Sequence, residues 1–303
     1  DFDDMKIFIV LIFFISSSIA NDSPPGLFSW FSASELSYAG GGSLLLAPTS
    51  RSINLAETTI DKKFSTSYIF YPAGIQAQSA SLLLSINNKV IIGSINHISY
   101  GTFKGYDENA IQTDNYTSSD TWVRLGYTEP FKKLPLRFGM SSQVYFSKLE
   151  NYKSTFLYSS FGLTWGIEKY KLEIGFMIND FLLIHNDTSE GSINKSANFN
   201  IGFCKELIYL PLKMSIDFRT NGHTTFEDCY ISGEFKVSDA FSFNLGTSTR
   251  KYSQNTGQSL SQTIFGSSGI GINYKNKDLI LGYGLYLYGT GGFSNGFDLS
   301  INF

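Results

Sequence analysis

The side chains that could carry acid–base chemistry in this chain are few and scattered. The chain has three histidines, His97, His185 and His223. Hydrolysis would need a His beside a nucleophile or beside paired acids. The acids nearest in sequence to the last two histidines are Asp180, Asp187, Glu227 and Asp228. No motif links these residues, so we predict no catalytic residue and interpret them as polar decoration of loops.

The sequence gives equally little evidence for a metal site, a cofactor or a nucleic-acid partner. The only cysteines are Cys204 and Cys229, and no spacing of His, Cys and Asp resembles a metal site. The net charge of −3 argues against a nucleic-acid partner, because binding nucleic acid would require a stripe of basic residues. We therefore expect no metal, no cofactor and no nucleic-acid partner. Function must come from the elements that the chain builds.

The last seven residues indicate what those elements are. Four apolar residues alternate with polar ones, and the chain ends on the last of them: Phe297, Leu299, Ile301 and Phe303. Period-two alternation predicts a strand with one apolar and one polar face. A soluble sandwich shows such alternation, and so does a transmembrane barrel. A final strand that ends on Phe looks like the C-terminal signal of outer-membrane β-barrels, so we predict that these four residues form a membrane-insertion signal.

The N-terminal residues predict export. Met5 and Lys6 precede an apolar run over residues 7–15, and small residues lead to Ala20. This is the pattern of a secretory signal peptide, and we assign residues 1–20 to it with cleavage after Ala20. The acidic residues 1–4 do not fit a signal peptide, and we interpret them as lying upstream of the true start.

The composition fits an exported β-protein that faces lipid. Charged residues make up 16% of the chain, against about 25% in ordinary soluble domains. Aromatic residues also reach 16%, with 27 Phe and 18 Tyr. A soluble protein of this size would carry more Lys and Glu on its surface. No linker or low-complexity tract divides the 303 residues, so we expect residues 64–303 to form one barrel.

Strand patterns follow one another along most of the chain. In residues 160–167, for example, Phe161, Leu163 and Trp165 alternate with small or polar residues. Similar alternation covers residues 136–147, 197–203, 241–246 and 279–287. No window shows a helical period. The polar face suits the interior of a barrel, but alternation alone does not exclude a sandwich with an apolar core.

The lengths of the connections favour the barrel. Short connections at residues 87–88, 129–134, 168–169, 205–210, 238 and 275–277 alternate with longer polar ones at 101–119, 148–153, 185–195, 220–225, 249–261 and 289–293. Outer-membrane barrels have short periplasmic turns and longer extracellular loops. Counting back from Phe303 predicts an all-β, antiparallel, transmembrane barrel of about fourteen strands with both ends periplasmic. In this topology Cys204 and Cys229 lie near opposite ends of the wall, so we predict two free thiols.

Residues 21–63 are left over. They contain three consecutive glycines, the apolar patch Leu44 to Leu46, and Pro48. The segment could form a first irregular strand, or it could fold into the lumen as a plug. We favour a short plug-like segment, because an apolar patch in a periplasmic tail would need a cover of its own.

Several short motifs resemble one family of outer-membrane proteins. Residues 98–103 (ISYGTF), 106–109 (YDEN) and 145–154 (YFSKLENYKS) look like segments of the PorV/PorQ-type barrels of the type IX secretion system, closer to PorQ. Asn54-Leu55-Ala56 lies where related long-chain-fatty-acid-transporter-like barrels often carry Asn-Pro-Ala, although the Pro is missing here.

This resemblance implies a barrel of fourteen strands in the outer membrane of a Gram-negative bacterium. It implies a binding partner rather than a catalyst: an adaptor that meets other secretion-system proteins or secreted cargo. The lipid of the outer membrane is the remaining partner, and we expect a monomeric barrel within a larger complex. The loop over residues 101–119 is where we predict partner contacts, through Asp107, Glu108, Asp114 and, just beyond it, Asp120. The alternative is a solvated loop whose acids only keep it soluble.

Three classes of function stay open. The resemblance favours an adaptor of a protein secretion and surface-attachment system. Related barrels and the predicted plug support a transporter or channel for small hydrophobic solutes such as fatty acids. An enzyme ranks last, because no catalytic motif supports it.

Overall fold

The computed structural model describes residues 26, 29–57, 62–132, 134–149, 152–187, 197–220, 228–253, 259–289 and 292–303. The predicted signal peptide, residues 1–20, lies outside the described residues. No helix in the described ranges has the length and apolar content to cross a membrane.

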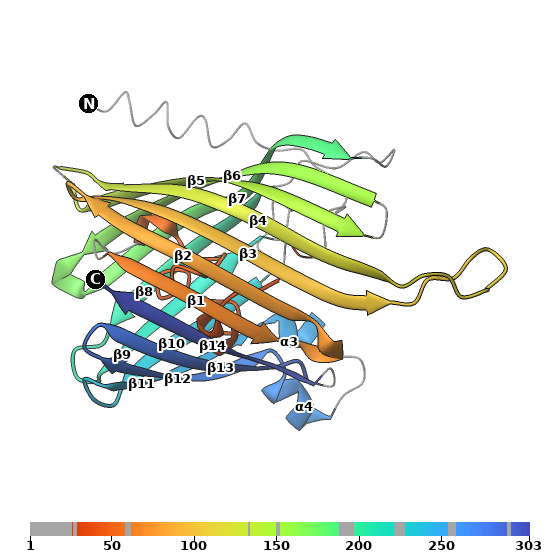
Figure 1. Cartoon of the computed structure of the whole chain (residues 1–303). Helices are drawn as coiled ribbons and strands as arrows, with labels where there is room; N and C mark the ends of the chain where they lie inside the picture. Colours follow the sequence, from red (N-terminus) through yellow and green to blue (C-terminus); the bar gives the residue numbers. More distant parts are fainter. Residues whose placement is uncertain are drawn as a thin grey trace.

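Fourteen antiparallel strands form one closed barrel, as the alternation and the connection lengths predict (Figure 1). Each strand pairs with its neighbours in chain order, and β1 closes the barrel against β14. The strands are β1 Lys63–Phe70, β2 Gln76–Ile86, β3 Lys89–Phe103, β4 Tyr116–Pro130, β5 Leu136–Leu149, β6 Tyr152–Ile167, β7 Leu172–Asp187, β8 Asn198–Glu206, β9 Leu212–Arg219, β10 Asp228–Lys236, β11 Phe241–Ser248, β12 Ser268–Asn276, β13 Leu279–Leu287 and β14 Phe293–Asn302.

The alternation of side chains sorts the two faces of the wall. On β14, Phe297 and Ile301 are exposed on the outside, while Ser294 and Ser300 are buried inside. Leu299 lies between the two outer residues and is half-buried, and Phe303 is exposed just beyond the strand. The outer surface is therefore apolar, and the side chains that face the lumen are small and polar, as in a transmembrane barrel and unlike a soluble sandwich. Whether the C-terminal residues act as an insertion signal stays a prediction.

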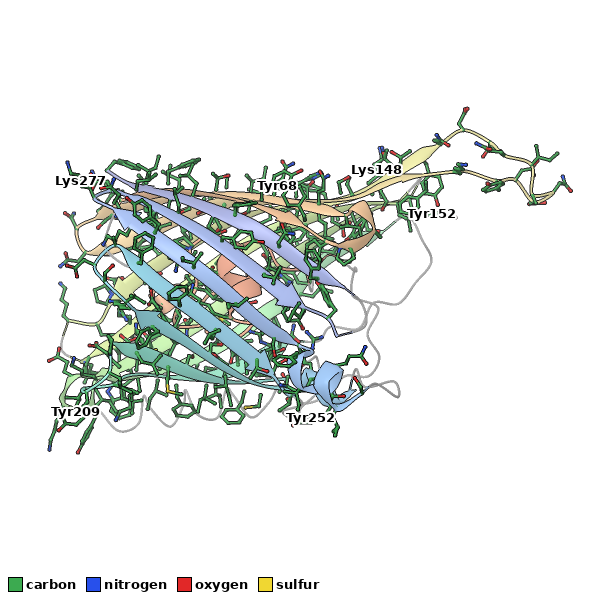
Figure 2. The ribbon with its side chains drawn as sticks, turned by 90° about the horizontal axis from the view of Figure 1, so that it is seen from below. Tyr68, Lys148, Tyr152, Tyr209, Tyr252 and Lys277 are labelled. Atoms are coloured by element: carbon green, nitrogen blue, oxygen red, sulfur yellow. The ribbon has the colours of Figure 1, made fainter. Side chains whose placement is uncertain are left out.

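The connections give the barrel two distinct ends (Figure 2). The short-turn end carries Phe303 and the tight connections, with Tyr209 and Lys277 at its rim. The long-loop end carries the β3–β4 connection and the short helices α3 (Arg250–Ser253) and α4 (Leu260–Phe265) between β11 and β12. One expected long loop was wrong: β5 runs to Leu149 and β6 starts at Tyr152, so most of residues 148–153 is strand.

The wall is uneven in height. Strands β3 to β7 have 14 to 16 residues, whereas β8 to β14 have 8 to 10. The longer strands extend past the others at the long-loop end, and the β3–β4 hairpin projects furthest (Figure 1).

Residues 29–57 lie inside the barrel and form a plug, which we call the plug segment (Figure 1). It contains the short helix α2 (Ala33–Ser37) and the 3-10 turn η2 (Leu55–Glu57). The plug prediction is confirmed and the alternative of an irregular first strand is wrong, because the first strand begins at Lys63. Nearly all side chains of the plug segment are buried, so its polar groups must find partners on the wall.

Candidate functional site

Glycines on the inner wall make room for the plug segment. Helix α2 lies against β11 to β14. At Gly269 on β12 and Gly284 on β13, an added Cβ would fall within 3.0 Å of the helix backbone. Gly246 on β11 meets the backbone of Tyr38 in the same way. These three glycines therefore form a surface, which we call the glycine seat, where the backbone of the plug segment packs directly against the wall with no side chain between them. The inner face of the barrel is thus shaped to fit the plug segment.

Carboxylates on the inner wall hold the backbone of the plug segment. Asp298 on β14 accepts hydrogen bonds from the first two N–H groups of α2, those of Ala33 (2.7 Å) and Ser34 (3.0 Å). These groups have no partner within the helix, and an anion complements the positive end of the helix dipole. Asp217 on β9 accepts similarly from the N–H of Gly42 at 2.8 Å and from the hydroxyl of Ser43. Both acids sit at lumen-facing strand positions.

Glu35 joins the two arms of the plug segment. Its carboxylate is fully buried and accepts from the N–H groups of Phe31 (2.7 Å), Arg51 (3.0 Å) and Ser52 (3.0 Å). The donors come from both sides of the turn that the segment makes in the lumen. Because a buried carboxylate needs such donors, Glu35 fixes the fold of the plug segment itself.

A bulge in the wall provides a buried ion pair. The β6–β7 register shifts near Asp180, whose backbone is left-handed with φ 57°. Asp180 is buried, forms an ion pair with Arg51 of the plug segment, and accepts from Gln143 Nε2 at 2.7 Å. Bulges redirect side chains, and this one aims a carboxylate at the plug segment.

The end of the plug segment packs on β4, β5 and β6. The Asn54 side chain donates to the wall carbonyls of Leu163 and Phe176, both at 3.3 Å. Glu57 forms an ion pair with Arg137 on β5. Burial raises the pKa of Glu57 to about 7, although the Arg137 charge opposes the shift. The motif that looked like Asn-Pro-Ala thus contributes an anchor of the plug segment.

An aromatic cluster closes the lumen at the long-loop end. It combines residues of the plug segment with inward-facing residues of β4, β5, β6 and β13: Trp30, Phe31, Trp122, Tyr145, Phe156, Tyr158 and Tyr286. The rings of Phe31 and Trp122 meet edge-on at 4.4 Å, and Trp122 stacks on Tyr145 at 5.0 Å. All seven are buried, so side-chain packing fills this half of the barrel.

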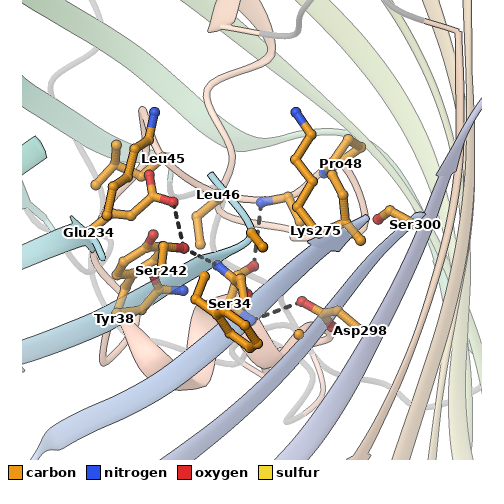
Figure 3. Close-up of a pocket in the computed structure, with 18 of the residues that line it drawn as sticks. Ser34, Tyr38, Leu45, Leu46, Pro48, Glu234, Ser242, Lys275, Asp298 and Ser300 are labelled. Atoms are coloured by element: carbon orange, nitrogen blue, oxygen red, sulfur yellow. Dashed lines mark hydrogen bonds between the residues drawn. The ribbon is translucent and has the colours of Figure 1, made fainter. Parts of the chain in front are cut away.

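The other half of the lumen is hollow. A cavity of about 1140 Å³, which we call the vestibule, lies between the plug segment and the wall from β10 to β14 (Figure 3). Its apolar side is the stretch Leu45 to Pro48 with Ile53. Its polar side includes Ser242, which donates to Glu234 at 3.0 Å, and Asn273, which donates to Ser242 at 3.4 Å. The lining reaches the turn around Ser238 and Asp239, so the vestibule opens at the short-turn end.

The four predicted partner-binding acids do not share one surface. Asp107, Glu108 and Asp114 are exposed on the β3–β4 connection, where Asp107 Oδ1 caps a turn by accepting from two backbone N–H groups. Asp120 instead is 1% exposed and lies inside the barrel on β4, where the Tyr100 hydroxyl donates to it at 2.6 Å. Alternation on β4 turns Asp120 inward, so its assignment to an exposed contact surface was wrong. Partner binding by the other three stays a prediction.

The candidate residues for catalysis and thiol chemistry are dispersed. His97 faces outward on β3 and shares a hydrogen bond of 2.7 Å with Thr121. The side chain of His185 and the whole of His223 lie outside the described residues. Cys204 and Cys229 are both free, near opposite ends of their strands as predicted. The described residues contain no group of three or more His, Cys, Asp or Glu that could hold a metal.

Sequence reasoning missed the residues that hold the plug segment: Glu35, Arg51, Asp180, Asp217 and Asp298. One signal was available for two of them. Asp217 and Asp298 stand between apolar residues at lumen-facing positions, and a carboxylate there needs a partner. Glu35, Arg51 and the bulge at Asp180 had no comparable signal.

Comparisons with known proteins agree on the fold. The P. putida toluene transporter TodX superposes with a TM-score of 0.58 at 11% identity, covering 90% of this chain and 98% of that one. A deltaS2S3 mutant of the TodX monoaromatic hydrocarbon channel gives 0.54 at 12% identity, covering 90% and 99%. A Pseudomonas aeruginosa FadL homologue gives 0.47 at 11% identity, covering 90% and 98%.

Sequence comparisons add no family. No protein-family model matches the chain, and no curated protein matches it. At 11 to 12% identity, the two TodX structures establish a shared barrel fold. This agrees with the predicted barrel fold and leaves both the relationship to fatty-acid transporters and the PorV/PorQ assignment as predictions.

Proposed function

We propose that this chain is an outer-membrane transporter or channel for small hydrophobic solutes. The observation that carries the proposal is the vestibule, a large cavity in the lumen with one apolar side formed by the plug segment. Its volume of about 1140 Å³ exceeds the roughly 300–1,000 Å³ of most small-molecule sites. The likeness to a toluene transporter fold supports the same function. The short-turn end then faces the periplasm, and the apolar outer face contacts lipid.

Transport through this barrel requires the plug segment or its aromatic neighbours to move. The vestibule already opens at the short-turn end, whereas the aromatic cluster fills the long-loop half. A solute arriving from outside must therefore displace aromatic rings or shift the plug segment before it reaches the vestibule. No covalent chemistry is needed, which agrees with a non-enzymatic role.

A reversible crosslink tests this function. The Ser67 hydroxyl on β1 donates to the Thr49 hydroxyl of the plug segment at 3.1 Å, so the pair T49C/S67C can tie the plug segment to the wall. The native thiols are removed by C204A and C229S. We expect cells with the reduced variant to take up labelled toluene faster than cells with empty vector, and the oxidised variant to lose this uptake. Uptake equal to empty vector in the uncrosslinked chain would contradict the function. Equal uptake in both redox states would contradict plug movement.

The secretion-adaptor hypothesis makes a different prediction. The short PorV/PorQ-like motifs support it, and the exposed acids of the β3–β4 connection provide a surface for a partner. Deleting the gene would then abolish surface display of cargo with type IX signal domains. Normal display together with impaired uptake of hydrophobic solutes would favour the transporter.

A further inference from the structure

The connection between β11 and β12 carries an exposed apolar surface at the long-loop end. Its members are 59% to 83% exposed, and we call them the α3–α4 patch: Tyr252 on α3 and Leu260, Ile264 and Phe265 on α4. Figure 2 shows Tyr252 pointing away from the barrel, and Figure 1 shows α4 beside the long-loop ends of β12 and β13. Exposed apolar side chains that gather in this way mark an interaction surface.

Hydrogen bonds and an ion pair hold the patch in place. Ser259 forms a capping box at the start of α4. The Lys251 ammonium group on α3 donates to the carbonyl of Ile264 at 3.1 Å, which joins the two helices. Arg250 forms an ion pair with Asp228 on β10 at 3.5 Å, which ties α3 to the wall. The fold therefore supports the patch and keeps its apolar side chains turned outward.

The apolar band of the outer wall ends just below the patch. On β11 and β12 the outward residues are apolar as far as the pair Leu245 and Ile270. The next outward pair toward the long-loop end is Thr247 with Ser268, whose hydroxyl groups share a hydrogen bond of 3.1 Å. The lipid-facing band of a transmembrane barrel ends at the membrane interface. On these strands the interface therefore begins near Thr247 and Ser268, and the patch follows at its level.

A different part of the rim shows what an ordinary solvated connection has there. The outward pairs of β3 and β4 toward the long-loop end are His97 with Thr121 and Ser99 with Ser119. The connection that follows them carries exposed acids. Residues 240–277, in contrast, contain no Asp or Glu, so no carboxylate beside the patch opposes contact with lipid phosphates. Short helices with an exposed apolar side lie in the headgroup region with that side buried.

We propose that the α3–α4 patch inserts into the lipid interface at the long-loop end and anchors this side of the barrel. Its aromatic rings suit the headgroup level, where Tyr is enriched. The strands below it are short: β11 has 8 residues and β12 has 9, against about 9–11 in a typical membrane strand. The patch thus extends the apolar height of the wall where the strands are shortest. This inference rests on the barrel lying in a membrane and is independent of whether solutes pass.

Fluorescence quenching tests the anchor in liposomes of phosphatidylethanolamine and phosphatidylglycerol. The native thiols are removed by C204A and C229S, and an environment-sensitive fluorophore is attached through L260C. The control is N109C, because Asn109 is exposed on the β3–β4 connection. We expect a nitroxide near the lipid headgroup to quench the label of L260C about threefold more than that of N109C. Aqueous iodide should quench the two labels in the opposite order.

A charge placed in the patch makes the test specific. Adding F265D to labelled L260C should lower lipid quenching to the level of N109C, because water attracts a carboxylate out of the interface. The matched change F265Y should leave the quenching unchanged. Equal lipid quenching in L260C and N109C would overturn the proposal. Shielding from iodide without lipid quenching would also overturn it, since a second copy or a bound solute would then cover the patch. Heat-modifiable gel migration verifies that each variant is folded, and toluene uptake is scored separately.

Discussion

The two halves of the lumen differ in what fills them. At the long-loop end, the described residues of the aromatic cluster and the plug segment pack against one another, and the rings meet at 4.4 to 5.0 Å. At the short-turn end, the same barrel wall surrounds a cavity of about 1140 Å³. The strands are paired continuously around both halves. Closure is therefore a property of the packed side chains and the seated plug segment, and changes there should open the barrel without dismantling it.

The largest effect is expected where the wall touches the plug backbone. In G284V, the new side chain would collide with the carbonyl of Ala33, and a backbone group cannot step aside. We expect the cost to exceed the roughly 1–3 kcal/mol of ordinary overpacking, so that the plug segment loses its seat. The long-loop half should then become permeable, which appears as a large rise in ion conductance across planar bilayers.

The control for this change is G166V. Gly166 also faces the lumen, on β6, but an added Cβ there meets nothing within 4 Å. Its conductance should stay at the wild-type level. A closed G284V barrel, or an equally open G166V barrel, would show that the glycine seat does not hold the plug segment.

Removing the charge at the wall bulge should have the next largest effect. D180N keeps an Asx side chain that tolerates the left-handed backbone, but it leaves Arg51 buried without its anion. Breaking a buried pair costs about 3 kcal/mol or more. Trypsin cleavage after Arg51 should rise accordingly, because that bond becomes accessible only when the plug segment leaves the wall. Because R51Q removes that trypsin site, the coupling is measured as ion conductance: R51Q combined with D180N should recover part of the loss of closure, and additive losses would argue against direct coupling.

A smaller effect is expected inside the plug segment. E35Q retains the size of the side chain but turns an amide NH2 toward backbone donors. Losing one charged hydrogen bond costs about 1.5–3 kcal/mol. The same cleavage assay should detect it, with E168Q in the exposed turn after β6 as the control. Unchanged protection in E35Q would mean that the wall contacts alone hold the plug segment.

The smallest effect is a pH dependence from Glu57. Burial raises its pKa from 4.5 to about 7, so the seated plug binds a proton that the released plug gives up between these values. The seated plug segment is therefore most stable below pH 4.5 and weakens as pH rises through 7. Cleavage after Arg51 should increase between pH 5 and 8 in wild type. Because trypsin is itself more active at higher pH, the cleavage rate is taken relative to that of E57Q. This ratio should rise between pH 5 and 8, and a constant ratio would exclude Glu57 as the cause.

The strands and their order could be predicted from the sequence because their signals are local. Alternation in β14 and the regular change between short and long connections depend only on neighbouring residues, and the strand count follows from them. The positions of Cys204 and Cys229 followed from that count. The plug was predicted from the apolar patch Leu44 to Leu46, which needed a cover. The course of the chain through the lumen was not predicted.

The interior could not be predicted in the same way. Asp298 read as one polar residue of an alternating strand, yet it holds the first turn of a helix 265 residues away. Asp120 was predicted to contact a partner together with the acids of the loop, yet it is buried in the lumen. Such pairings join residues that are far apart in the chain, and no regular spacing in the sequence predicts them.

The sequence alone therefore determined a lipid-facing barrel with fourteen strands and a plug, because period-two alternation and turn length depend only on residues that are close together in the chain. Only the tertiary structure decided which half of the lumen is closed, which glycines receive the plug backbone, and which charges meet. Those properties arise from closing the sheet, which brings β1 beside β14 and sets distant inward-facing side chains around one shared interior.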